Sequence, residues 1–370
     1  AGRAREHGGG LNSNQPACRA ARGVRCGTTQ LAHSPMKAWF HRFFSSPAAA
    51  AGTQLLQADQ PSAAAPTELS AQAWPMRRPD VDAALLAWML QGEPDSAESL
   101  GVREQAVLQA LEARAADTSA SLLPRAAGVV PALLARLRSD NSSLAELVEH
   151  VSRDQTLVAE VMAMSNSALY RRERPVMELG HSIQMLGVGG LRAAIARVVL
   201  KPMLDGRSGP LIRRAAPRLW QHTGYKTQLA AELARSQARD PFDAYLLALL
   251  HDMAWSVVLR ELDGAAGWRL SAPFVAALGQ WRDRMASLIA QQWQPHGPWV
   301  PATAELAQQG LGLGSGPDVL NLCTADQLAW LLCDPNRARA RSLAEPLLAA
   351  ALPPVRACYE DLDPTAVPRE

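Results

Sequence analysis

The pair His251-Asp252 holds the side chains best suited to acid–base or metal chemistry, and it lies in an unexpected setting. It interrupts Tyr245–Leu259, a stretch whose other residues are apolar except for Ser256. A buried carboxylate is costly unless it is paired, hydrogen-bonded or bound to a metal ion. The sequence therefore predicts that this pair has a partner elsewhere in the chain.

A helix is predicted to carry the pair. Asp240 can cap its first free N–H groups, Pro241 suits the first helical position, and Asp243 complements the positive end of the helix dipole. The apolar residues after this first turn cover every face of the helix, which is typical of a buried helix. We therefore expect His251 and Asp252 to lie in the core.

The composition predicts an all-α protein. The chain has 370 residues, 48% of them hydrophobic, which is enough for one large domain or two medium ones. Alanine and leucine are abundant, and no alternation of apolar and polar residues continues long enough for a strand-rich fold. The expected architecture is a multi-helix bundle.

Charge and cysteine content exclude several classes of protein. The net charge of +2 gives no basic face of the kind that drives nucleic-acid binding. The five cysteines include no Cys-x-x-Cys pair, which favours a reducing cytoplasm. No uninterrupted apolar run approaches the roughly 18 residues of a membrane span, so an integral membrane protein is not expected.

The chain divides into five predicted segments. Residues 1–35 are expected to be upstream or disordered sequence, with a targeting peptide as the alternative. Residues 36–78 combine a short amphipathic stretch, which could touch a membrane surface, a partner or its own domain, with a disordered linker. Residues 79–120 read as a helical lead-in, residues 121–355 as the main domain, and residues 356–370 as a tail.

The main domain resembles a known family, the bacterial HDOD domain, an output module related to the HD phosphohydrolases. The resemblance covers roughly Ser121 to Leu332. It rests on features that occur in the family's order and spacing: Leu123-Pro124 with Pro131, the helix that Asp154 is predicted to cap, Ser165-Asn166-Ser167, Ser182-Ile183, Leu186-Gly187, Leu191-Arg192, Trp220-x-His222 and Leu249-Leu250-His251-Asp252. It implies an all-α fold like that of the HD phosphohydrolases.

The resemblance also implies partners for the central pair. In the HD superfamily a first His, a His-Asp pair and a distant Asp hold one or two metal ions. His222, at the opening of a helix, matches the first His; His251 and Asp252 match the pair; and Asp326 falls where the last Asp would come. All four positions thus carry residues able to bind a divalent metal.

The sequence departs from the catalytic pattern at several positions. Bulky Met253-Ala254-Trp255 follows the His-Asp pair, Arg282 replaces a further His, and no His lies between Trp299 and Asn321. HDOD domains are generally regarded as lacking enzymatic activity. The resemblance therefore implies a non-catalytic signalling module that binds a protein partner or a small ligand, with no catalytic residue and no cofactor.

Two interpretations of the four polar residues stay open. In the favoured one, His222, His251, Asp252 and Asp326 form a buried polar cluster in which the histidines donate to the carboxylates without metal. In the alternative, the same residues bind a divalent metal in a phosphohydrolase that acts on a nucleotide or cyclic dinucleotide.

Two further stretches are candidate binding sites. Arg171, Arg172 and Arg174 could grip a small anionic ligand, although such a run is more often a solvated loop. The stretch Leu186–Leu200 could be a DNA-reading helix-turn-helix, but its apolar content favours a core helix. Nucleic-acid binding is therefore not expected.

Overall fold

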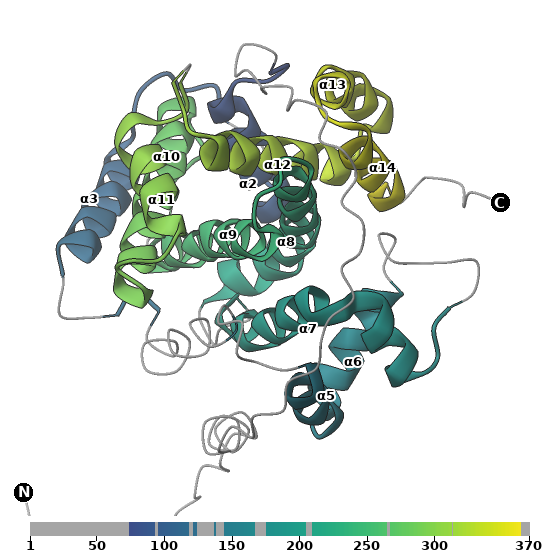
Figure 1. Ribbon diagram of the computed structural model, residues 1–370. Helices are drawn as coiled ribbons and strands as arrows, with labels where there is room; N and C mark the ends of the chain where they lie inside the picture. The colour runs from purple at the N-terminus through teal and green to yellow at the C-terminus, as the bar shows by residue number, and fades with distance from the viewer. Residues whose placement is uncertain are drawn as a thin grey trace, which may run out of the picture. The chain divides into compact units, whose positions relative to one another are not determined.

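The computed structural model is all-α over the residues that it describes, which confirms the predicted fold class (Figure 1). Those residues are 74–92, 95–117, 121–123, 137, 144–166, 175–204, 209–264, 267–312 and 314–363. Within these ranges there is no strand, and a single isolated bridge joins Asp95 and Ser271. The stretch at 36–44 that was predicted to be amphipathic lies outside the described residues.

The helices follow one another through these ranges. In chain order they are α2 (Arg78–Leu90), α3 (Val102–Ala116), α5 (Leu144–Ser152), α6 (Gln155–Ser165), α7 (Leu179–Leu204), α8 (Pro210–Ser236), α9 (Pro241–Gly264), α10 (Ala272–Trp293), α11 (Trp299–Gln309), α12 (Pro317–Cys333), α13 (Arg337–Ala350) and α14 (Pro353–Leu362).

Helix α9 is the core helix around which the others pack. The Asp240 carboxylate accepts hydrogen bonds from the backbone N–H groups of Phe242 (2.7 Å) and Asp243 (3.2 Å), so the predicted cap is confirmed. Every residue from Tyr245 to Leu259 is buried, because α8, α10 and α7 pack against α9. His251 and Asp252 therefore lie in the core, as predicted.

Helix α8 begins earlier than the sequence suggested. His222 was expected to open a helix, but α8 starts at Pro210 and places His222 in its interior. The reason is a tertiary cap: the Asp263 carboxylate, at the end of α9, accepts hydrogen bonds from the N–H groups of Leu211 (2.7 Å) and Ile212 (3.2 Å). This cap comes from a residue distant in sequence, so local pattern could not reveal it.

Helix α7 changes direction at Gly187. Gly187 has φ 61° and ψ −169°, a conformation that residues with a side chain rarely adopt. Helix α6 packs against α7, and its first turn is capped by Asp154 as predicted, with hydrogen bonds from Thr156 N (2.8 Å) and Leu157 N (3.1 Å).

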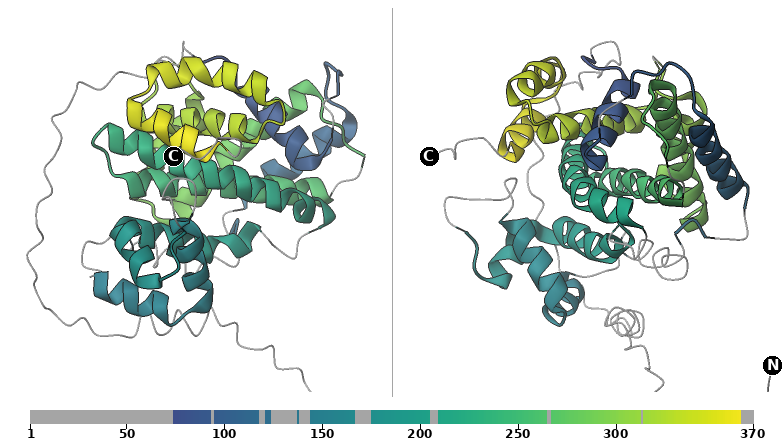
Figure 2. Two further views of the ribbon diagram at one scale, coloured as in Figure 1. Left: turned by 90° about the vertical axis from the view of Figure 1, so that its right-hand side faces the viewer. Right: turned by 180° about the vertical axis from the view of Figure 1, so that it is seen from behind.

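The N-terminal and C-terminal helices pack onto this core. Helix α2 contacts α10, α8 and α12. Helices α13 and α14 lie side by side in both views of Figure 2, with α14 against α8 and α13 against α12. The bundle thus draws helices from both ends of the described chain around α8 and α9.

Two segments, Leu179–Pro202 and Pro241–Gly264, are long and apolar enough to cross a membrane by length and composition. In the second, 89% of the most apolar window is buried by the rest of the protein, against 56% in the first. The apolar character of α9 is thus accounted for by its place in the core.

Candidate functional site

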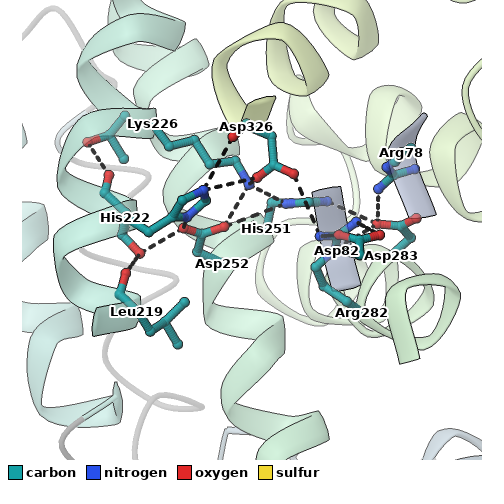
Figure 3. Close-up of polar contacts among 12 residues, drawn as sticks. Arg78, Asp82, Leu219, His222, Lys226, His251, Asp252, Arg282, Asp283 and Asp326 are labelled. Atoms are coloured by element: carbon teal, nitrogen blue, oxygen red, sulfur yellow. Dashed lines mark hydrogen bonds and ion pairs between the residues drawn. The ribbon is translucent and has the colours of Figure 1, made fainter. Parts of the chain in front are cut away.

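The predicted polar residues belong to a larger buried cluster (Figure 3). We call it the ionic network and define it as Arg78, Asp82, His222, Lys226, His251, Asp252, Arg282, Asp283 and Asp326. Helices α2, α8, α9, α10 and α12 supply these residues.

His222 and Asp252 form the first contact of the network. His222 Nδ1 lies 3.0 Å from Asp252 Oδ2, and both side chains are fully buried. The Thr223 hydroxyl donates to the same carboxylate oxygen at 2.8 Å. On its other side, His222 Nε2 lies 3.4 Å from the backbone oxygen of Asp326 and 3.8 Å from its carboxylate. His222 is thus held between the two carboxylate-bearing residues that were predicted as its partners.

Lys226 lies at the centre of the network, one helical turn after His222 on α8. Its ammonium donates to Asp252 Oδ1 at 2.6 Å and forms an ion pair with Asp326 Oδ1. It also lies 2.6 Å from His251 Nδ1. Two of these contacts have hydrogen-bond geometry, and the contact with Asp326 is an ion pair. Lys226, which is fully buried, thus bridges the two carboxylates.

His251 links Lys226 to a second group of charges. Because its Nδ1 accepts from Lys226, the proton of the neutral ring belongs on Nε2, which lies 3.0 Å from Asp283 Oδ1. Arg78 donates to the same Asp283 oxygen at 2.5 Å. The carboxylate of Asp283, rather than those of Asp252 or Asp326, is therefore the acceptor of His251.

Arg282 is the second cation that lies close to the predicted residues. It contacts Asp82 through Nη1 (2.5 Å) and Nη2 (3.3 Å), and donates from Nε to Asp283 at 3.1 Å. Nη1 lies 3.7 Å from Asp326 Oδ2. The guanidinium also lies over Trp255, 5.0 Å from the ring centroid. Arg282 thus fixes the side of Asp326 that Lys226 does not reach.

The charges of the network favour the ionised form of three of its four carboxylates. Burial disfavours the charged form of Asp252, but the ammonium of Lys226 and the contact with His222 outweigh burial and hold the pKa well below its usual value. Against the same cost of burial, Arg78 and Arg282 lower the pKa of Asp283, and Lys226 and Arg282 lower that of Asp326. At Asp82 burial outweighs Arg282, so its pKa is raised.

A metal ion does not fit the site as the side chains are arranged. His222, Asp252 and Asp326 each offer a ligand atom, and these atoms lie within 4.8 Å of one another. A shared ion would have to lie about 2.0–2.6 Å from each of them. The Lys226 ammonium already lies between the two carboxylates, and His251 is turned towards Lys226 and Asp283. A fixed cation from the chain takes the position that a metal bound to these carboxylates would need.

The structure brings the four predicted residues into one network but adds members that sequence reasoning missed. These are Lys226, Arg78, Asp82 and Asp283. Two signals could have found some of them: Lys226 follows His222 by four residues, and so shares its helix face, and Asp283 adjoins Arg282. Arg171, Arg172 and Arg174, the predicted anion-binding residues, lie outside the described residues.

Comparison with known proteins agrees with the resemblance seen in the sequence. The family model described as the HDOD domain matches residues 123–267. This span contains His222, Lys226, His251 and Asp252, whereas the other network residues flank it. No curated protein matches the chain.

Two solved structures are similar to the chain. One is a protein from Shewanella amazonensis SB2B provisionally named as a metal-dependent phosphohydrolase, with 16% identity, a TM-score of 0.49, and coverage of 71% of this chain and 99% of that one. The other is an HDOD domain protein of unknown function from Geobacter sulfurreducens, with 15% identity, a TM-score of 0.41, and coverage of 77% and 94%.

Proposed function

Residues 123–267 form an HDOD domain, and from this premise we propose that the protein is a non-catalytic signal-transduction module of the bacterial cytoplasm. It relays a signal by binding a protein partner or a small ligand. It needs no cofactor, and its buried polar centre serves the fold rather than turnover.

The observation that carries this proposal is the position of Lys226. Its ammonium contacts Asp252, Asp326 and His251 at once. Metal-assisted hydrolysis requires an ion with open coordination positions for water and substrate. A buried lysine that bridges the carboxylates provides charge balance without such positions, which supports a structural role for the site.

The network gives the module a fixed geometry. Its residues come from α2, α8, α9, α10 and α12, so each ion pair constrains the relative position of two helices. Removing one partner of a buried pair is strongly destabilising because it leaves an uncompensated charge. The helices around the centre therefore hold a defined surface for the partner or ligand.

The alternative is a metal-dependent phosphohydrolase of the HD type that acts on a nucleotide or cyclic dinucleotide. The observation in its favour is that His222, Asp252 and Asp326 present ligand atoms within 4.8 Å of one another. This alternative requires Lys226 to leave its three partners. Its ammonium would then be either buried without a counter-charge or exposed to solvent.

Metal analysis joined to a turnover assay tests the proposal. The full chain is purified without a chelating tag, its metal content is measured, and hydrolysis is assayed on a panel of nucleotides and cyclic dinucleotides with Mn²⁺ or Mg²⁺ added. We expect metal well below one ion per chain and no turnover. Stoichiometric metal together with turnover that Asp252→Ala abolishes would establish the phosphohydrolase instead.

A further inference from the structure

Two open hollows meet on the surface where the end of α2, the start of α8 and the end of α9 come together. One has a volume of about 540 Å³ and the other a volume of about 580 Å³. Arg214 and Trp268 line both hollows, and we call the two together the Arg214 groove. The described residues that line it include no member of the ionic network, so the groove is a separate surface.

Each hollow of the groove has apolar side chains at its base. Leu90 and Leu270 line one hollow, and Leu211 and Leu262 line the other. All four are buried beneath the surface. The indole N–H of Trp268 donates to the Leu262 carbonyl at 3.0 Å, which fixes the ring between the hollows. Each hollow can therefore remove one apolar side chain of a partner from water.

Arg214 is the cation of the groove without a counter-charge. It is exposed, and no carboxylate of the described residues is paired with it. The other charged residues of the lining are already engaged. Arg269 Nη1 lies 3.3 Å from Asp95 Oδ2, and the Asp263 carboxylate accepts from two backbone N–H groups of α8. An incoming carboxylate can thus reach the Arg214 guanidinium and accept from its paired donors.

The walls of the groove are held in place before any partner binds. Asp95 N donates to the Leu270 carbonyl at 2.8 Å, which ties the chain after α2 to the chain before α10. Helices α2, α8 and α9, which border the groove, also supply residues to the ionic network. A surface that is already ordered loses less entropy on binding.

The shape of the groove favours an extended chain over a compact small molecule. Small-molecule sites usually bury roughly 70–90% of the surface of their ligand. Here both hollows are open to solvent and lie on either side of one cation. In an extended peptide, every second side chain points to the same face, with a spacing of roughly 6.5 Å. Three such side chains can contact one hollow, the cation and the other hollow in turn.

We infer that the Arg214 groove binds an extended acidic segment of a protein partner. One Asp or Glu of the segment contacts the guanidinium of Arg214. A large apolar residue two positions before it enters one hollow, and another two positions after it enters the other. This inference rests on the proposed signalling function and gives the chemistry of the protein partner.

A peptide titration followed by NMR tests the inference on the full chain labelled with ¹⁵N. The probe is Ser-Leu-Ser-Glu-Ser-Leu-Ser, acetylated and amidated so that Glu carries its only charge. The readout is the indole N–H signal of Trp268, which is assigned with Trp268→Phe. In one comparator Gln replaces Glu, and the other, Leu-Leu-Ser-Glu-Ser-Ser-Ser, has the same composition but one apolar residue out of place.

We expect saturable binding of the probe and binding about tenfold weaker for each comparator. The Gln peptide loses the charge-assisted hydrogen bonds to Arg214. The rearranged peptide leaves one hollow without an apolar side chain. Because the contact with Arg214 is exposed, binding of the probe should also weaken as NaCl is raised from 50 to 500 mM.

Two arginine variants locate the contact. Arg214→Gln should weaken binding of the probe about tenfold and reduce its advantage over the Gln peptide to less than about twofold. Arg213→Gln is the matched control, since it removes the same charge from the neighbouring exposed position, which lines neither hollow. It should bind like the wild type. Both positions are exposed, so both variants should keep the wild-type urea midpoint.

Several outcomes would overturn the inference. Equal binding of the Glu and Gln peptides, equal losses in the two arginine variants, or no saturable binding of the probe would each remove the acidic segment. Inorganic phosphate that saturates the Trp268 signal at a lower concentration than the probe would make the groove a small-anion site. Self-association of the chain that Arg214→Gln abolishes would assign the groove to a second copy.

The proposed function fails separately from this inference. Nucleotide hydrolysis in the turnover assay would remove the signalling module without changing the peptide titrations. An absence of peptide binding would leave the metal and turnover results as they stand.

Discussion

Lys226 is the residue on which the character of the site depends. It is fully buried, donates to the carboxylate of Asp252 and the imidazole of His251, and forms an ion pair with Asp326. A compact ammonium can take the place of a divalent ion in charge balance, but it offers no coordination position to substrate. With Lys226 beside them, we expect the acidic residues to stabilise the fold rather than to bind a metal ion.

Lys226→Ala is expected to lower the free energy of unfolding by about 3–5 kcal/mol, because the substitution leaves Asp252 and Asp326 facing one another without their cation. Urea unfolding measures this loss. Lys201→Ala, which removes an exposed lysine from α7, is the matched control and should change stability by less than about 0.5 kcal/mol.

Adding Mn²⁺ to the Lys226→Ala variant shows how much of its lost stability comes from the missing positive charge and how much from lost packing. The Lys226→Ala protein should regain part of its stability as Mn²⁺ rises, since ligands that bind only the folded state stabilise it. Wild type should not respond. An unchanged urea midpoint in Lys226→Ala, or an equal Mn²⁺ response in both proteins, would contradict a cation role for Lys226.

Acid should destabilise the protein through the ionic network. The folded-state pKa values of Asp252, Asp283 and Asp326 are lowered, whereas an unfolded aspartate has a pKa of about 3.9. Their stabilisation is therefore complete above about pH 5 and is lost as pH falls below the unfolded pKa. Asp82, whose pKa is raised, opposes this trend but is one carboxylate against three.

Urea midpoints between pH 7 and pH 3.5 check the direction. The free energy of unfolding should fall by about 2 kcal/mol or more. Asp283→Asn should show a shallower dependence, and Glu112→Gln, at an exposed position on α3, should keep the wild-type slope. A protein more stable at pH 3.5 than at pH 7 would reverse the expected sign.

At the residue scale the sequence revealed several members of the ionic network but not which side chains contact one another. His251-Asp252 stood out because charge in an apolar helix is rare, and the resemblance supplied His222 and Asp326. The link from His251 to Asp283 depends on how α9 packs against α10. Tertiary packing of this kind leaves no local pattern, so Arg78 and Asp82 on α2 were also missed.

At the scale of elements, the start of α8 shows why helix boundaries resist sequence reasoning. The sequence predicted that a helix opens near His222. Its first turns, however, depend on Asp263 at the other end of α9. Caps supplied within one segment, as at Asp154 and Asp240, were predicted and found.

Asp263→Ala is expected to lower stability by about 1 kcal/mol, the usual cost of losing a helix cap. Hydrogen exchange should quicken at the Leu211 and Ile212 amides, which donate to this carboxylate. Asp361→Ala, in α14, should leave both amides unchanged. Unaltered exchange at Leu211 and Ile212 in the Asp263 variant would show that α8 holds its first turn without the cap.

At the scale of the whole molecule, the span that matches the family is smaller than the structural unit that the network holds together. Residues 123–267 include α8 and α9, but α2, α10 and α12 contribute Asp82, Arg282 and Asp326 from outside it. The surfaces of α9 that meet α10 and α12 would be bare in an isolated matched span. The all-α class was predictable from composition, whereas this dependence on flanking helices was not.

A fragment of residues 121–267 should therefore lack a cooperative thermal transition, because Lys226 and His222 lose Asp326, and α9 loses its cover. A fragment of residues 74–363, which keeps every helix of the network, should melt cooperatively. Circular dichroism at 222 nm measures both. A sharp, sigmoidal melt of the shorter fragment would show that the matched span folds without its neighbours.

Because Lys226 supplies the positive charge between the two carboxylates, folding should not depend on a supply of metal ions. A site that depends on a captured ion fails when chelators or starvation remove that ion, or when a competing metal takes its place. Lys226 is synthesised with the chain and lies fully enclosed between its partners. We therefore expect the fold of this protein to be equally stable whether metal ions are scarce or abundant.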